Sequence, residues 1–143
     1  PATLYYDEVR TPTYTDCLNR LFERLLARPL SGLYHAGGPR KLSLYQIAQI
    51  VNRVGGFDPR HLQGCLRHEA GPIPPRAGDV SMRSDKLVKA LGESPFDAWP
   101  AYEEFVPTHP EWHRERGGFE GSEALLAEVL YRNPRRQSGA ALR

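Results

Sequence analysis

Two arginines stand in loops whose backbone is restricted by proline and glycine. Arg10 precedes Thr11-Pro12-Thr13-Tyr14, and Arg76 lies in Pro75-Arg76-Ala77-Gly78-Asp79-Val80. A guanidinium is a planar fork that bonds two oxygens of a phosphate or carboxylate at once. A rigid loop lets such a group project into a cleft, so both arginines are candidate anion-binding residues. The alternative for each is an ordinary surface ion pair.

Two groups of histidines have spacings that occur in metal sites. His61, Cys65 and His68 lie close in sequence, but a closed structural zinc site needs four ligands. If the segment is a strand, His68 points to the opposite face from the other two. His109 and His113 would face each other on a helix, yet a proline follows His109 directly. We therefore predict no metal site.

No complete catalytic group is visible in the sequence. Cys17 falls in the first turn of an expected helix, where the helix dipole favours an anion, but no histidine lies near it in sequence. A buried, inert cysteine is the alternative. The pair Gly37-Gly38 lacks the G-x-G-x-x-G spacing of a dinucleotide-binding loop. We predict no catalytic residue in this chain.

The elements expected to position these residues alternate between extended and helical segments. Tyr-, Val- and Thr-rich or short apolar stretches predict extended segments at 2–6, 9–14, 32–36, 61–68 and 80–82, with 32–36 a buried strand. Apolar residues recur at helical spacing and predict helices at 15–27, 43–54, 84–91 and 122–130. The expected capping residues at their starts are Thr15, Ser43, Ser84 and Ser122. This alternation indicates an α/β organisation with too few strands for a full sheet.

Composition narrows the class of protein. The 143 residues carry 19 Lys and Arg against 17 Asp and Glu, and this length suits one domain with its own core. No stretch approaches the roughly 20 apolar residues of a membrane helix, so we expect no membrane partner. Two cysteines make no disulfide framework, which favours a reducing compartment, the cytoplasm.

The distribution of charge argues against a nucleic-acid partner. Most arginines alternate with acids, and only the end of the chain, after Glu128, is purely basic. A nucleic-acid binder acting through that end would lose affinity steeply with salt. Position 1 is proline and the single methionine is Met82, so we expect the sequence to be part of a longer protein.

Four segments in register carry a resemblance to a known family. They are Val9-Arg10-Thr11-Pro12-Thr13-Tyr14-Thr15-Asp16, the stretch 32–38, the helix 44–54, and 75–92, beginning Pro75-Arg76-Ala77-Gly78-Asp79. In this order and spacing they resemble the carboxy-terminal half of extended short-chain dehydrogenase/reductases, most closely the dTDP-4-dehydrorhamnose reductases. The resemblance runs from about residue 5 to 92. Cys17 departs from it, because the family usually has an acid there.

The resemblance implies the C-terminal portion of an extended Rossmann-type reductase. Residues 1–92 would form the last strand and helix units of the Rossmann core plus a small α+β substrate-binding lobe. Residues 93–143 match no part of the family and are expected to form an irregular extension with a C-terminal helix, a strap or an oligomer contact.

The resemblance also implies a site. Arginines at the motif positions of Arg10 and Arg76 contact the diphosphate of a nucleotide sugar in extended relatives. Tyr14, Asp16 and Asp79 would support them. We expect Asp16 to stabilise the start of its helix through the dipole, and Asp79 to accept backbone hydrogen bonds after the Gly78 turn.

What the chain lacks limits its activity. The family carries its glycine-rich NAD(P) site and its catalytic Tyr-x-x-x-Lys pair upstream, and neither is present here. The resemblance therefore implies NAD(P)H in the intact enzyme, none bound by this chain alone, and no hydride transfer without the upstream Rossmann half. The expected partners are a nucleotide-sugar substrate, that upstream half and, through exposed apolar surface, a second copy of the chain.

A non-enzymatic alternative remains open. The same fold can serve as a noncatalytic binding or regulatory module, and the regulatory subunit of methionine adenosyltransferase also resembles this family. An upstream Tyr-x-x-x-Lys pair with a glycine-rich fingerprint favours the enzyme, and its absence favours the module.

Overall fold

The computed structural model describes residues 2–97, 105–115 and 120–130. Within them the chain forms four short strands, four α-helices and two 3-10 turns. The strands are β1 (Ala2–Tyr5), β2 (Val9–Arg10), β3 (Leu42–Ser43) and β4 (Leu62–Cys65). The helices are α1 (Thr15–Ala27), α2 (Leu44–Gly55), α3 (Asp85–Leu91) and α4 (Glu123–Leu130), and the 3-10 turns are η1 (Pro59–His61) and η2 (Arg67–Ala70).

The strands pair into two small sheets. β1 runs parallel to β4, with Ala2 opposite Leu62 and Tyr5 opposite Cys65. β2 runs antiparallel to β3, with Val9 opposite Ser43. The parallel strands β1 and β4 are far apart in sequence, and helices α1 and α2 lie between them along the chain. The expected α/β class is therefore confirmed.

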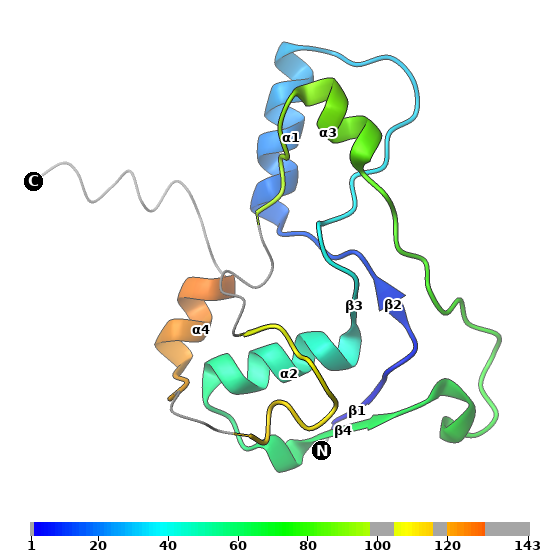
Figure 1. Cartoon of the computed structure of the whole chain (residues 1–143), viewed down its shortest axis with the longest axis vertical. Helices are drawn as coiled ribbons and strands as arrows, with labels where there is room; N and C mark the ends of the chain where they lie inside the picture. Colours follow the sequence, from blue (N-terminus) through cyan, green and yellow to red (C-terminus); the bar gives the residue numbers. More distant parts are fainter. Residues whose placement is uncertain (1, 98–104, 116–119, 131–143) are drawn as a thin grey trace, which may run out of the picture.

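The helices divide the described chain into two lobes (Figure 1). In one, α2 and α4 pack together beside β1 and β4, around a buried cluster of Leu42, Ile50, Val54, Phe105, Trp112 and Val129. In the other, α1 and α3 lie side by side around Cys17, Leu21, Leu87 and Phe96. Tyr14 packs against both clusters and joins them.

The capping and spacing patterns of the sequence predict the helix boundaries closely. α1 spans the expected 15–27. α2 begins with a capping box in which Ser43 Oγ accepts from Gln46 N and Gln46 Oε1 accepts from Ser43 N. It ends at Gly56, whose φ of 69° is a left-handed conformation that favours glycine. Leu125 N donates to Ser122 Oγ, the expected cap of α4.

Two expected caps do not form. The residue before α1 is Tyr14, so Thr15 is already helical and its side chain does not cap the helix. Ser84 precedes α3 but makes no side-chain cap bond there. Its Oγ donates instead to the carbonyl oxygen of Gly37 at 2.7 Å. A tertiary contact therefore replaces the local one.

The prediction of a buried strand at 32–36 is wrong. This segment has no strand structure, and Leu33 is 77% exposed. A strand needs a hydrogen-bonding neighbour, and none of the described strands lies beside it. The predicted extended segments 9–14 and 61–68 form strands only where they have a partner, as β2 and β4. The predicted segment 80–82 forms no strand.

The region after residue 92 contributes to the core. Phe105, Trp112 and Val129 are all buried in the α2 cluster. Arg53 on α2 donates from Nη1 to the carbonyl oxygen of Trp112 at 3.0 Å, and its Cζ lies 4.2 Å from the centroid of the Trp112 ring. The end of α2 is thus covered by a segment that no family resemblance assigned.

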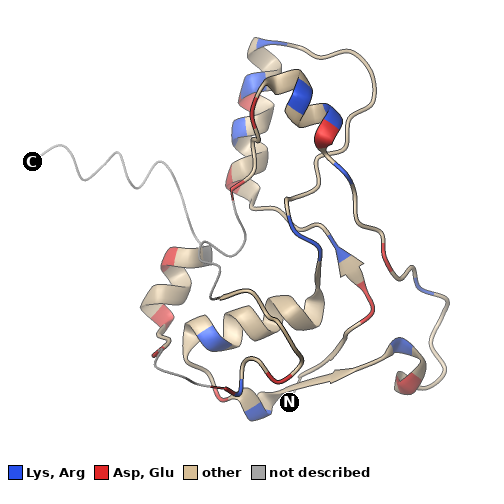
Figure 2. Cartoon of the chain, in the orientation of Figure 1, with Lys and Arg blue, Asp and Glu red and all other residues tan. Residues whose placement is uncertain are grey.

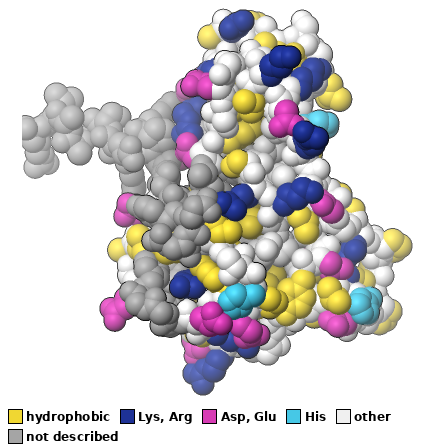
Figure 3. Space-filling view, viewed as in Figure 1, with side chains coloured by type: hydrophobic (Ala, Val, Ile, Leu, Met, Phe, Trp, Pro, Cys, Tyr) yellow, Lys and Arg dark blue, Asp and Glu magenta, His cyan; other side chains and the backbone are white. Residues whose placement is uncertain are grey.

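One apolar face remains uncovered by the described residues. Phe22 and Leu26 on α1 are 56% and 84% exposed, and Leu33 follows in the next loop. The other apolar side chains of α1 pack toward α3. Hydrophobic side chains accordingly show among the charged ones over this part of the molecule (Figure 3). None of the described helices is long and apolar enough to cross a bilayer.

Candidate functional site

The segments that the sequence singled out meet around Thr11. The carbonyl oxygen of Thr11 accepts from Gly38 N at 3.0 Å, and its Oγ1 accepts from Met82 N at 3.2 Å. These two bonds join β2 to the glycine pair and to the stretch before α3. The same stretch reaches Gly37 through Ser84.

Gly37 and Gly38 are required by close packing. A Cβ on Gly38 would lie 1.8 Å from the carbonyl oxygen of Pro12, and one on Gly37 would lie 2.4 Å from Thr11 Oγ1. Both distances are far inside van der Waals contact. The glycine pair therefore serves backbone packing at this junction.

The two arginine-bearing loops lie side by side. Val9 N donates to the carbonyl oxygen of Gly78 at 3.0 Å, and Val80 N donates to the carbonyl oxygen of Val9 at 3.1 Å. These bonds set Val9 beside Asp79 in a parallel bridge. Arg10 and Arg76 are thereby brought to the same part of the fold, although 66 positions separate residues 10 and 76.

Arg76 forms a two-pronged ion pair with Glu8. Its Nε donates to Glu8 Oε1, and its Nη2 donates to Oε2 at 3.0 Å. Glu8 is only 2% exposed, whereas the Arg76 side chain is 48% exposed. A guanidinium has more N–H donors than these two bonds use. The outer edge of Arg76 can thus still donate to a ligand.

Arg10 supports the neighbouring backbone. Its Nη1 donates to the carbonyl oxygens of Val9 at 2.8 Å and Gly78 at 2.9 Å. The guanidinium therefore lies against the turn that follows Arg76 and fixes its position. Its Nε and Nη2 make no hydrogen bond within the described residues.

A third arginine belongs to this group, and sequence reasoning missed it. Arg67 Nε donates to Asp7 Oδ2 at 2.9 Å, and its Nη1 donates to the carbonyl oxygen of Arg76. The bonds from Arg67 hold the pKa of Asp7 below its usual value. The sequence predicts an extended segment at 61–68 that includes Arg67, but this residue begins η2, and its side chain bonds to the Arg76 loop.

These groups border an open pocket of about 400 Å³. Asp7, Arg67 and Arg76 supply its charged lining, and its remaining wall consists of His68 and the loop that begins at Gly71. That loop contains Pro72, Pro74 and Pro75, whose rings fix φ and stiffen the wall. The structure thus sets a positively charged residue from each of two loops at the rim of one cavity.

Of the three expected supporting residues, Asp79 is the one whose bonds lie next to the Arg10 and Arg76 loops. Asp79 accepts hydrogen bonds from Ser81 N at 2.9 Å and from Lys41 Nζ at 3.0 Å. Both bonds lower the pKa of Asp79, and the bond from Ser81 has the larger effect. Asp16 lies in the first turn of α1, and Tyr14 immediately precedes that helix. The role of Tyr14 and Asp16 in supporting the arginines stays a prediction.

The histidines do not gather with other ligands. His109 Nε2 lies 3.1 Å from Glu115, and buried His113 contacts Gln49 and the carbonyl oxygen of Pro59. Over the ranges that the structure describes, no three His, Cys, Asp or Glu side chains are placed to hold a metal ion.

Charge is mixed over the surface. Basic residues occur on α1, α2, α3 and the connecting segments, with acidic residues close to many of them (Figure 2). On the face seen in Figure 3, blue and magenta side chains alternate, with no broad area of one sign. The three arginines near Asp7 and Glu8 therefore form a local group within a mixed surface.

Comparison with known proteins supplies one structural relative. No protein-family model matches the sequence, and no curated protein sequence matches it. The fold is similar to that of a dTDP-4-dehydrorhamnose reductase from Bacillus anthracis, solved in complex with NADP, with a TM-score of 0.59 and 18% sequence identity. The match covers 68% of this chain and 34% of the reductase chain. The fold of this α/β chain is therefore similar to part of that reductase, and the chain spans about a third of that relative's length.

Proposed function

We propose that this chain is the substrate-binding part of an NAD(P)-dependent nucleotide-sugar reductase that transfers hydride to a C4 ketone of the sugar. The observation that carries the proposal is that Arg67 and Arg76 line one cavity, while Arg10 bonds to Gly78 in the turn that follows Arg76. The similarity in fold to a dTDP-sugar reductase supports the same assignment.

The arginines suit a diphosphate. Such a group carries about two negative charges and several acceptor oxygens. The guanidiniums of Arg10, Arg67 and Arg76 carry three positive charges, and the carboxylates of Asp7 and Glu8 carry two negative ones. The group therefore has one net positive charge. The bonds from Arg76 Nε and Nη2 to Glu8 fix the orientation of the Arg76 side chain before a ligand binds. Binding then costs less side-chain entropy than it would for a mobile arginine.

The reaction itself belongs to residues outside this chain. A tyrosine acid, its lysine and the NAD(P)H that supplies hydride would come from an upstream Rossmann half. The part described here would position the sugar near the hydride donor, and positioning alone lowers a barrier by several kcal/mol. We propose that the exposed apolar side chains of Phe22, Leu26 and Leu33 pack against that upstream half.

Titration calorimetry with dTDP as the probe tests the proposal. We expect Arg76→Ala to weaken dTDP binding about tenfold to a hundredfold, the effect of losing a hydrogen bond to a charged group. Arg83→Ala is the matched control, because Arg83 is 88% exposed and pairs only with Asp85 among the described residues. Equal affinities for the two variants would exclude the diphosphate site.

A noncatalytic module of the same fold is the second candidate. It would bind nucleotide through the same arginines and would have no tyrosine–lysine pair upstream. Assay of the whole protein with NADPH and a dTDP-4-keto sugar separates the two. Turnover supports the reductase, and binding without turnover supports the module.

A further inference from the structure

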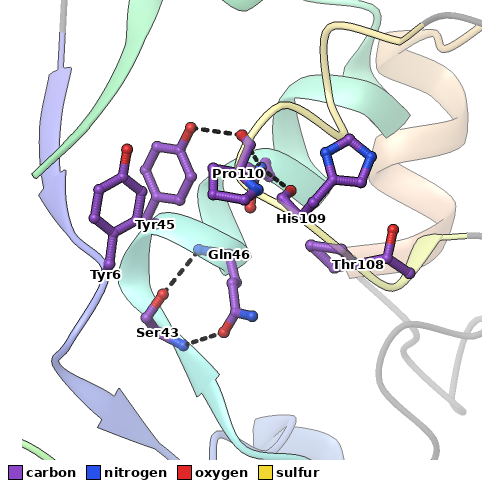
Figure 4. Close-up of a pocket in the computed structure, with 9 residues that line it drawn as sticks. Tyr6, Ser43, Tyr45, Gln46, Thr108, His109 and Pro110 are labelled. Atoms are coloured by element: carbon purple, nitrogen blue, oxygen red, sulfur yellow. Dashed lines mark hydrogen bonds between the residues drawn. The ribbon is translucent and has the colours of Figure 1, made fainter.

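Residues 105–115, which we call the strap, are bonded to α2 by side chains that the helix supplies. Tyr45 donates from its hydroxyl to the carbonyl oxygen of Pro110 at 3.0 Å (Figure 4). Gln49 Nε2 donates to the same carbonyl oxygen at 2.7 Å. Arg53 makes the contacts with the strap that were described above. Residues four apart on a helix share a face, so one side of α2 bonds to the backbone of the strap at successive turns.

The strap also completes the core of its lobe. Phe105 and Trp112 are 2% and 6% exposed, and they belong to the same buried cluster as Leu42, Ile50 and Val54. If the strap left α2, the apolar surface that these two rings cover would meet water. Docking of the strap and burial of this surface are therefore one event.

His113 lies where the strap meets two other elements. Its side chain is almost fully buried, in a residue that is 1% exposed. Its Nδ1 lies 3.2 Å from Gln49 Nε2 on α2, and its Nε2 lies 3.3 Å from the carbonyl oxygen of Pro59 in η1. The ring of Tyr45 meets the imidazole edge to face, with centroids 6.0 Å apart. A single imidazole thus connects the strap to α2 and to η1.

The partners of His113 determine its protonation state. A carbonyl oxygen only accepts, so His113 Nε2 carries a proton and donates to Pro59. The amide of Gln49 cannot be reversed, because Nε2 also donates to Pro110 and a reversed amide would set Oε1 against that carbonyl oxygen. Gln49 therefore presents an N–H to His113 Nδ1, which must be the unprotonated acceptor. A second proton on His113 would set two donors against each other in a site closed to bulk water.

The titratable and charged groups around His113 come from all three elements. They are Glu111 and Arg114 on the strap, Tyr45 and Arg53 on α2, and Asp58, Arg60 and His61, which flank Pro59 in the chain. Both acids of this set are already paired with an arginine, at 2.7 Å in each case. Burial lowers the pKa of His113 below its usual 6.5. The docked strap therefore favours the neutral imidazole.

We propose that acid releases the strap: protonation of His113 detaches residues 105–115 from α2 while the lobe of α1 and α3 stays folded. In the released strap, the imidazole takes up its proton in water, and the carbonyl oxygens that α2 had bonded accept from water instead. The α1 and α3 lobe has its own buried cluster and shares only Tyr14 with the cluster around α2. It therefore does not depend on the strap for its core.

Release of the strap also opens a pocket. A cavity of about 260 Å³ lies between α2 and the turn at 107–110, and Tyr6 and Tyr45 line it from the side opposite the strap. Because the turn is part of the strap, this cavity loses one wall when the strap detaches. The inference is independent of the proposed function, since it uses no residue of the arginine group.

Hydrogen exchange followed by mass spectrometry tests the release on the whole chain. Between pH 6.5 and the lower pKa of the docked state, the ratio of released to docked strap should rise by up to about tenfold per pH unit. We expect peptides of the strap and of α2 to exchange faster at pH 5.5 than at pH 6.5, after correction for the intrinsic rates. Peptides of α1 and α3 should keep their protection. Equal loss of protection in α1 and α3 would mean global unfolding and would overturn the inference.

Two histidine variants locate the titrating group. His113→Gln retains one acceptor and one donor but takes up no proton, so it should remove the acid dependence of exchange in the strap. His109→Gln is the matched control and should keep that dependence, because the His109 side chain is 39% exposed and its Nε2 lies 3.1 Å from Glu115. The reverse result would assign the release to His109 and refute the role of His113.

The unmodified chain decides the matter even if His113→Gln does not fold. An NMR titration of the His113 ring in the isotope-labelled chain gives the midpoint of its protonation. Exchange in the strap should rise over the same pH range in which this ring titrates. A ring that titrates while the strap stays protected would show that the strap tolerates the charge, and the inference would be wrong.

Discussion

The buried carboxylate of Glu8 is held from both oxygens by the guanidinium of Arg76, a residue 68 positions further along the chain. The pair joins the residue before β2 to the loop before α3, and it makes Arg76 a structural residue as well as a candidate ligand contact. Removing one partner of such a pair leaves the other buried without compensation.

Stability should therefore respond to Arg76. We expect Arg76→Ala to lower the melting temperature clearly more than Arg83→Ala, since Asp85, the partner of Arg83, is 73% exposed and loses little. Thermal unfolding followed by circular dichroism measures both. Adding Glu8→Gln to Arg76→Ala should recover part of the loss, because no buried charge then remains. Failure of the double variant to recover any stability would show that the charge of Glu8 is not the cause.

Acid should destabilise the chain through His113. Burial lowers the pKa of His113 below its usual 6.5, and its Nδ1 faces Gln49 Nε2. The unfolded state therefore binds the proton more readily, so this stability is present above about pH 6.5 and is lost as pH falls through the lower folded value. Glu111 and Arg114 are the charged neighbours that modify the effect.

Urea unfolding at pH 7.5 and at pH 5 measures that loss, and His113→Gln should reduce the difference between the two. The carboxylates whose pKa is lowered, such as Asp7 and Asp79, lose their contribution only below about pH 4 and do not interfere. An unchanged pH difference in His113→Gln would assign the effect to another group.

The uncovered apolar face should drive self-association of the chain when it is studied alone. Leu26 and Leu33 are 84% and 77% exposed, and fully burying a leucine contributes about 1.5–3 kcal/mol. We expect the chain to pair or aggregate with rising concentration in light scattering. Replacing both leucines by glutamine should shift it toward monomer. Met82→Gln, at a side chain 44% exposed elsewhere, should not. A monomer at high concentration would show that the chain packs as a self-sufficient domain.

Gly38 offers a test of the junction at Thr11. Gly38→Ala should cost about 3 kcal/mol or more, because the new methyl meets the carbonyl oxygen of Pro12 and neither backbone segment can move freely. Gly92→Ala is the control for backbone strain, since Gly92 has a φ of 85° and open space around it. That change should cost about 1–2 kcal/mol. Equal losses in urea unfolding would mean that the junction adapts.

Local chemistry explains which elements could be predicted. The capping box of Ser43 and Gln46 and the glycine at 56 define α2 within a few residues of its ends, so the sequence located it. The stretch 32–36 has the composition of a strand, but strand formation depends on a neighbour that no local pattern contains.

The same distinction applies to the candidate site. Arg10 and Arg76 could be selected because proline and glycine around them are visible in the sequence. The pairing of Arg67 with Asp7 could not be found, since the two residues are 60 positions apart and nothing near either marks the other. A basic residue two positions after a strand, facing an acid two positions after that strand's parallel neighbour, is the pattern that would have indicated it.

The interlocked backbones at Pro12 and Gly38 also bear on how remote relatives can be recognised. At 18% identity an overall alignment carries little information, but a steric requirement acts on particular positions whatever the rest of the sequence does. A chain with the same junction needs glycine wherever the Thr-Pro carbonyl fills the space of a side chain. Searching for Thr-Pro ahead of a helix together with a later Gly-Gly, as two linked features, would therefore find chains that share this junction without overall sequence similarity.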